Sequence, residues 1–116
     1  MVVNGHNDIA EFLNGVKKLS DEYMESNFPS LDKHGFECSW GPKYVKVFSV
    51  EYRNSSYYSR NVYCLIDRYT GDIYKAASWN KPAKHVRGNI FADDKGLSCC
   101  TPYGIKYLVR TDITFW

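Results

Sequence analysis

The amino-acid sequence predicts one α+β domain, in which an N-terminal amphipathic helix packs on an antiparallel β-meander of three or four strands. Two patterns favour this class: helical spacing of apolar residues near the N-terminus, and a central region rich in β-branched and aromatic residues. The length of 116 residues suits a single domain spanning 1–116. We expect the Gly/Pro-rich last third of the chain to be irregular.

The helix is expected at residues 7–28. Asn7 can cap its N-terminus, and Pro29 ends it because the residue before a proline is disfavoured in helical conformation. The apolar positions follow the i, i+3, i+4, i+7 spacing of one helix face: Ile9, Phe12, Leu13, Val16, Leu19 and Tyr23.

The meander is expected to span residues 36–77, with long apolar runs at 44–52 and 61–67 and a partner strand that begins at Asp72. Turn residues separate these runs: Gly41-Pro42, Asn54-Ser55-Ser56 and Thr70-Gly71-Asp72. Gly71 is free to adopt a positive φ, which favours a tight hairpin at this point.

The C-terminal segment, 92–116, is expected to contain short helical turns. Residues 106–110 could form an edge strand or a short helix. The last two residues, Phe115 and Trp116, predict that the tail docks on the domain.

The composition predicts a cytosolic protein that does not cross a membrane. No apolar run approaches ~18 residues, and the N-terminus lacks the basic and apolar regions of a signal peptide. The four cysteines form no CxxC pair, so we expect free thiols in a reducing compartment.

The basic segment, residues 75–91, has the most distinctive chemistry in the chain. It carries four basic residues, one His and no acid, although the net charge of the whole chain is only +2. Cationic side chains can hold phosphates, and a tryptophan can stack on a base. These residue types predict an anion site formed by Lys75, Trp79, Lys81, Lys84, His85, Arg87 and Asn89.

Structural roles compete with this hypothesis. Trp79 could belong to the core, and Arg87 could pair with Asp67 or Asp72 to fix the loop to the hairpin. If the segment does bind nucleic acid, Tyr63 and Tyr74 are further candidates for base stacking.

Catalysis and metal binding have little support in the sequence. It contains no GxSxG, HExxH or P-loop motif, and no Rossmann glycine run. A nuclease that depends on His85 would need a second acid–base partner. The cysteines lack the paired spacing of a zinc site, so we expect no metal, no cofactor and no enzymatic activity.

The run YCLIDRYTGDIYKAASWNKPAKHVRGNIF, residues 63–91, resembles a family of short uncharacterised proteins encoded by bacteriophages and other large DNA viruses. Members share a segment of the form YCxxDxxTGDxxKAASWxxPAKHxRGNI and a YG…YLR ending. Here YLVR continues into TDITFW, so a free C-terminal arginine is not expected. The resemblance implies a viral origin and action in the cytoplasm of the infected host cell.

Together these observations predict a small viral accessory protein that binds nucleic acid or a phosphorylated nucleotide without catalysis. The alternative is a protein that binds a host protein, antagonises host defence or forms part of the virion. An exposed patch at Tyr57-Tyr58 or Phe115-Trp116 would serve that role. The sequence leaves the oligomeric state open, a dimer included.

Overall fold

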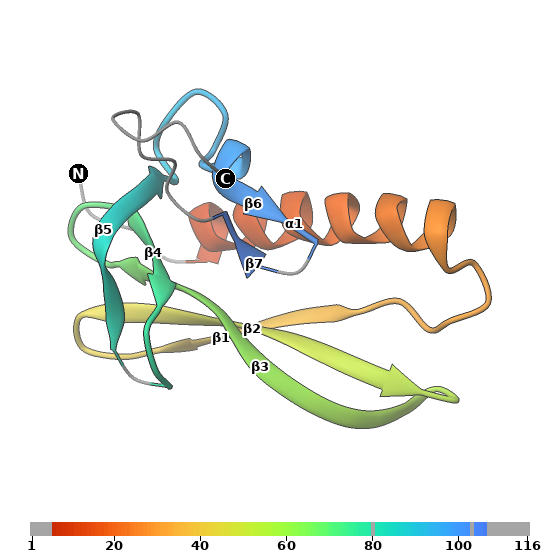
Figure 1. Cartoon of the computed structure of the whole chain (residues 1–116). Helices are drawn as coiled ribbons and strands as arrows, with labels where there is room; N and C mark the ends of the chain where they lie inside the picture. The colour runs from red at the N-terminus through yellow and green to blue at the C-terminus, as the bar shows by residue number, and fades with distance from the viewer. Residues whose placement is uncertain (1–5, 80, 103, 107–116) are drawn as a thin grey trace, which may run out of the picture.

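The computed structural model describes residues 6–79, 81–102 and 104–106 and confirms the α+β class (Figure 1). One helix, α1 (His6–Asn27), lies against one face of an antiparallel sheet. Its bounds agree with the prediction to within one residue at each end. Asn7 belongs to the first turn rather than preceding it. The Phe28 N–H donates to the Met24 carbonyl (2.7 Å), which closes the last turn just before Pro29.

The sheet has five strands, so the predicted number of three or four is too low. Each strand pairs antiparallel with the next one in the chain, which gives a simple meander. In spatial order the strands are β1 (Gly35–Trp40), β2 (Tyr44–Arg53), β3 (Ser56–Asp67), β4 (Asp72–Ala76) and β5 (Pro82–Asn89).

The additional strand, β5, corrects the prediction of an irregular basic segment. Between β4 and β5 the Ala77 N–H donates to the Lys81 carbonyl (2.8 Å), which brings the two strands together. Pro82 takes the first position of the strand, which a proline tolerates. Irregularities in the β4–β5 register on either side of Tyr74 break the alternation along the strand. A short, irregular edge strand therefore lacks the period-2 pattern by which strands are detected in a sequence.

Two predicted turns are confirmed by their backbone conformation. Asn54 and Ser55 have φ values of 51° and 65° and form a two-residue loop between β2 and β3. Gly71 has φ of 79° in the turn between β3 and β4. The carboxylate of Asp67 accepts hydrogen bonds from the N–H groups of Tyr69 (2.7 Å) and Thr70 (3.1 Å), as expected for an Asp that begins a turn.

The core lies between α1 and the sheet. Buried residues of the helix meet alternate residues of β2, β3 and β4, and the segment after β5 closes the core at one end. The buried cluster consists of Ile9, Phe12, Val16, Val45, Val47, Tyr63, Cys64, Ile66, Ile73, Ile90, Cys99, Cys100 and Ile105. Of the predicted helix positions, Ile9, Phe12 and Val16 are fully buried, whereas Leu13 and Leu19 are partly buried.

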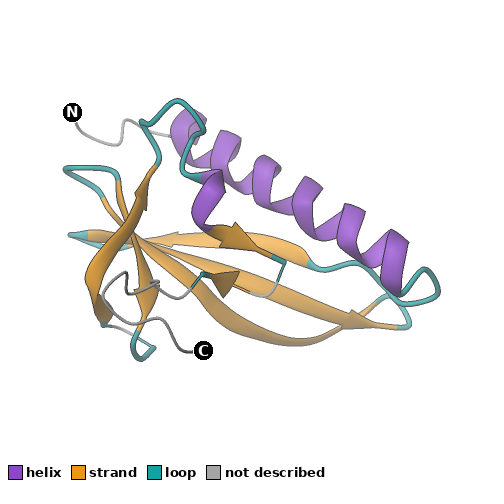
Figure 2. Cartoon of the chain, turned by 45° about the horizontal axis from the view of Figure 1, so that its top comes forward, coloured by secondary structure: helices purple, strands orange, loops and turns teal. Residues whose placement is uncertain are grey.

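A small C-terminal unit packs on the same side of the sheet as α1 (Figure 2). It consists of a 3₁₀ turn, η1 (Leu97–Cys99), and two short paired strands, β6 (Cys100–Thr101) and β7 (Gly104–Ile105). A Cβ at Gly15 would lie 2.5 Å from a methyl carbon of Leu97, so a larger residue here would require the Leu97 side chain to shift. The strand or helix predicted at 106–110, and the docking of the tail, concern positions outside the described residues, apart from Lys106.

Replacing Phe12 with Ala should lower the free energy of unfolding by about 3–5 kcal/mol, because the ring is fully buried and its loss leaves a cavity. Urea denaturation measures this difference. The control is Glu22→Ala on an exposed position of the same helix, which should stay within about 0.5 kcal/mol of wild type. A loss below about 1 kcal/mol for Phe12→Ala would contradict the core described above.

Candidate functional site

The face of the sheet opposite α1 is not covered by a second layer of the described residues (Figures 1 and 2). The turn between β4 and β5 projects past this open face, on the side away from the helix. Four side chains gather where the turn meets the sheet: Lys46 and Phe48 from β2, Arg60 from β3 and Trp79 from the turn. We call these four residues the basic-aromatic cluster.

The two rings of the cluster lie next to each other, and both cations lie over them. The centroids of Phe48 and Trp79 are 5.4 Å apart, with an interplanar angle of 42°. Lys46 Nζ is 5.1 Å from the Trp79 centroid, and Arg60 Cζ is 4.4 Å from the Phe48 centroid. These distances fall within the range of cation–π attraction. Phe48 is only 4% exposed, whereas Trp79 is 49% exposed and offers ring surface to a ligand.

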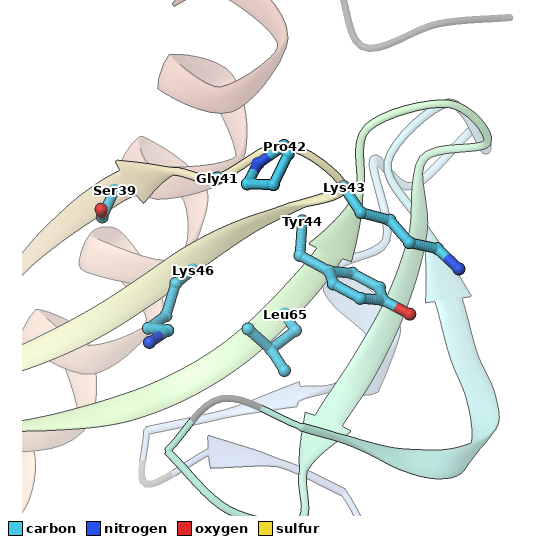
Figure 3. A pocket seen from close by; sticks show the side chains of 7 residues that line it. All are labelled: Ser39, Gly41, Pro42, Lys43, Tyr44, Lys46 and Leu65. Carbon is cyan, nitrogen blue, oxygen red and sulfur yellow. The ribbon is translucent and has the colours of Figure 1, made fainter.

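A hollow of about 300 Å³ lies beside the cluster on the open face (Figure 3). Leu65, which is 1% exposed, contributes an apolar side chain to its lining. Lys46 belongs both to the hollow and to the cluster, so the two are continuous. The hollow is lined by Ser39, Gly41, Pro42, Lys43, Tyr44, Lys46 and Leu65.

Two tyrosines stand together at this end of the open face. The rings of Tyr44 and Tyr74 meet edge to face, with centroids 6.2 Å apart. Partial burial raises the pKa of Tyr74, and the nearby carboxylates of Asp72 and Asp67 raise it further. The Tyr74 hydroxyl therefore stays protonated at neutral pH and can donate a hydrogen bond. Lys43 Nζ lies 5.4 Å from the Tyr44 centroid and adds a cation at this point.

The predicted site residues do not converge on one place. Trp79 lies in the basic-aromatic cluster, and Lys81, Lys84 and His85 are exposed on the β4–β5 hairpin. Their role in binding remains a prediction.

Lys75, Arg87 and Asn89 have hydrogen-bond partners within the fold. Lys75 Nζ donates to the Ile105 carbonyl (3.1 Å), and Arg87 Nη1 donates to the next carbonyl, that of Lys106 (3.0 Å). The partner of Arg87 is thus this carbonyl rather than the carboxylate of Asp67 or Asp72.

The amide of Asn89 is fully engaged. Its Nδ2 donates to the Thr70 carbonyl (2.9 Å) and to Asp72 Oδ1 (3.0 Å), while its Oδ1 accepts from the Phe91 N–H (2.7 Å). This residue therefore ties β5 to the turn that follows β3.

The prediction that Tyr63 stacks on bases is wrong, because its side chain is 3% exposed in the core. Its hydroxyl donates to the Thr101 carbonyl, and its ring meets Phe36 edge to face at 5.5 Å. The pKa of this hydroxyl is raised, mainly because it is buried, so the hydroxyl stays protonated at neutral pH. Tyr63 thus connects the sheet to the C-terminal unit.

The sequence reasoning missed Lys46, Phe48 and Arg60, which come from strands rather than from the basic segment. A signal was present in the run Tyr44–Phe48, where Lys46 stands between Val45 and Val47. Side chains alternate along a strand, so a lysine between two core valines points to the opposite face. No such rule predicts that Trp79, many residues later, reaches the same place.

Within the described part of the chain, the other reactive groups do not gather into a second site. All four cysteines are free thiols, and Cys64, Cys99 and Cys100 are buried in the core. Burial raises the pKa of Cys64 well above that of an ordinary thiol, so it stays protonated. Among the described residues, no group of three His, Cys, Asp or Glu side chains could hold a metal ion. Over the same part of the chain, no helix has both the length and the apolarity needed to span a membrane.

Comparison with known proteins gives a family without a known function. The model of a family of unknown function (DUF7717) matches residues 7–105, which include α1, the whole sheet and the C-terminal unit. No curated protein and no solved structure matches the chain.

Replacing Arg87 with Ala should lower the free energy of unfolding by about 1 kcal/mol, because the Lys106 carbonyl loses its donor. Lys84→Ala, on an exposed position of the same strand, should stay within about 0.5 kcal/mol of wild type. Thermal and urea unfolding of both variants test the difference. Equal stability of the two would mean that the Arg87 hydrogen bond contributes nothing measurable.

Proposed function

The chain belongs to this family of unknown function, and we propose that it binds single-stranded nucleic acid, without catalysis, through the basic-aromatic cluster. The observation that carries the proposal is the half-exposed ring of Trp79 flanked by Lys46 and Arg60 on an uncovered sheet face. Proteins that bind single strands combine these two elements: cations that follow the phosphates and aromatic rings on which bases stack.

The electrostatics of the open face favour a polyanion. Lys43, Lys46 and Arg60 contribute three cations to the hollow and the cluster. The register places two acids next to these residues: Glu37 pairs with Phe48 and is exposed to solvent, and Asp67 pairs with Tyr44. The exposed basic residues Lys81 and Lys84 on the β4–β5 hairpin extend the positive charge beyond the face.

The contacts within the cluster hold its side chains in place before a ligand binds. Lys46 and Arg60 already lie against the rings, so their side chains lose less conformational freedom when they meet a phosphate. The buried ring of Phe48 supports Trp79 from one side and leaves part of its surface exposed. This arrangement recognises any base, because every base has a π-face.

We further infer that the protein acts in the cytoplasm of a virus-infected cell. The support is the resemblance of residues 63–91 to short proteins of bacteriophages and other large DNA viruses.

A second candidate function is binding to a host protein through the tip of the β2–β3 hairpin. Tyr57 and Tyr58 are 63% and 48% exposed there, and Arg53 Cζ lies 3.7 Å from the Tyr58 centroid. Exposed tyrosine and arginine are typical of energetically important positions in protein interfaces. A double variant, Tyr57→Ala with Tyr58→Ala, should keep full affinity for nucleic acid, because neither tyrosine belongs to the basic-aromatic cluster. The same variant should lose binding to a host protein, so it distinguishes the two functions.

Replacing Trp79 with Ala should weaken binding to a labelled mixed-sequence single strand by about 1–3 kcal/mol, or roughly 5- to 150-fold in Kd, because a stacked base is lost. Fluorescence anisotropy measures the affinity. Trp79→Phe keeps an aromatic ring and should retain most of it. Unchanged affinity of the folded Trp79→Ala variant would overturn the proposed site.

Replacing Arg60 with Gln should make the plot of log K against log salt shallower by about 0.7, because one phosphate contact with a single strand disappears. Glutamine removes the charge while keeping part of the aliphatic stem over Phe48. The matched control is Lys18→Gln, an exposed cation on α1, which should leave the slope as it is. Equal changes in the two variants would indicate binding by net charge alone.

A further inference from the structure

We infer that the hollow beside the basic-aromatic cluster is a subsite for one nucleoside phosphate, with the base against Tyr44 and the phosphate held by Lys43 and Lys46. This inference rests on the proposed function, since it assigns the nucleotide next to the one stacked on Trp79. It also extends that function to free mononucleotides, because a mononucleotide carries both the base and the phosphate that the subsite would bind.

The lining of the hollow fits a flat aromatic group. Leu65 forms the apolar floor and is 1% exposed, so a ligand would rest mainly on the side chains around it, the Tyr44 ring above all. The ring of Tyr44 forms one wall and is held edge-on by Tyr74 at 6.2 Å, which fixes its position. Figure 3 shows Tyr44, Lys46 and Leu65 among the side chains that line the hollow. An apolar floor beside a fixed ring is a suitable surface for a base.

The two lysines fit the phosphate. Lys43 and Lys46 both belong to the lining of the hollow, which therefore carries two ammonium groups. Lysine is a common phosphate ligand because its ammonium acts as a mobile point charge. The two acids near Tyr74, Asp67 and Asp72, have hydrogen-bond donors of their own. The Asp67 carboxylate accepts from two backbone N–H groups, and that of Asp72 accepts from Asn89 Nδ2.

The wall of the hollow offers little means to distinguish one base from another. The Gly41 N–H donates to the Tyr44 carbonyl (2.9 Å), and the Gly41 carbonyl accepts from Arg68 Nη1 (2.8 Å). Pro42 has no N–H, and its carbonyl accepts from the Tyr69 hydroxyl (3.4 Å). Gly41 and Pro42 therefore offer no unpaired backbone N–H to a base, and each of their carbonyls already accepts one hydrogen bond. The subsite should therefore accept purines and pyrimidines alike.

The size of the hollow limits it to one ligand group. Its volume of about 300 Å³ lies at the lower end of the range of ~300–1,000 Å³ for small-molecule sites. Lys46 lines the hollow and also lies over Trp79, which places the subsite directly next to the stacking ring. Two neighbouring nucleotides of one strand can therefore use the two places.

The test is an NMR titration of the full chain with adenosine 5′-monophosphate, and separately with adenosine and with inorganic phosphate. With the monophosphate we expect saturable chemical-shift changes at the backbone amides of Ser39, Lys43, Tyr44 and Lys46. Adenosine alone or inorganic phosphate alone should cause much smaller changes. Cytidine 5′-monophosphate should shift the same amides to a similar extent. Shifts elsewhere, or equal shifts with inorganic phosphate, would overturn the subsite.

Two variants test the subsite without removing core contacts. Lys43→Gln removes one ammonium from an exposed turn position, and Ser39→Tyr places a ring into the hollow from an exposed position of β1. Each should abolish the monophosphate shifts at concentrations that saturate wild type, with unchanged thermal unfolding. Ser56→Tyr, at an exposed position near the β2–β3 turn, is the matched control and should leave the shifts intact.

The variants also separate this inference from the proposed function. If Ser39→Tyr and Lys43→Gln bind the single strand with wild-type affinity while Trp79→Ala does not, the cluster binds nucleic acid and the subsite inference fails. If monophosphate shifts are lost in both variants but no variant affects a single strand, the subsite holds for free nucleotides and the proposed function fails.

Discussion

The structure depends on the burial of one apolar helix face against one face of a five-stranded sheet. Phe12 and Val16 of α1 meet Val45, Val47 and Ile66 of the sheet, and this layer supplies most of the apolar burial among the described residues. Burial of this kind is the dominant favourable contribution to folding. Because one helix covers one face, the other face has to be stabilised by its own side chains.

The open face achieves this with long cationic side chains over aromatic rings. Lys46 Nζ and Arg60 Cζ lie 5.9 Å and 4.4 Å from the centroid of Phe48, which is nearly inaccessible although no helix covers it. The faces of aromatic rings attract cations electrostatically, which favours this arrangement. The same arrangement places positive charge next to aromatic surface, so the feature that stabilises the open face also makes it suitable for nucleic acid.

Residues of the basic segment have two different roles: some form hydrogen bonds within the fold, and Trp79 lies on the open face. Lys75 and Arg87 donate to consecutive carbonyls at Ile105 and Lys106 and hold the end of the described chain against the sheet, while Asn89 fixes β5 to a turn. Trp79, at the turn, instead reaches the open face. A run of similar residues in the sequence therefore does not form one surface, because alternation and bulges in the β4–β5 hairpin send its members in different directions.

The sequence by itself determined the class, the helix and most of the sheet. Periodic apolar residues and turn residues act locally, so α1, β2 and the turns at Asn54 and Gly71 could be predicted from their own neighbourhoods. Only the tertiary structure decided the fifth strand and the site. The strand β5 forms because β4 offers an edge to an otherwise irregular segment, and the cluster forms because the hairpin brings Trp79 to Lys46, Phe48 and Arg60. Contacts between residues far apart in the chain leave no local pattern, which is the physical reason why the sequence did not reveal them.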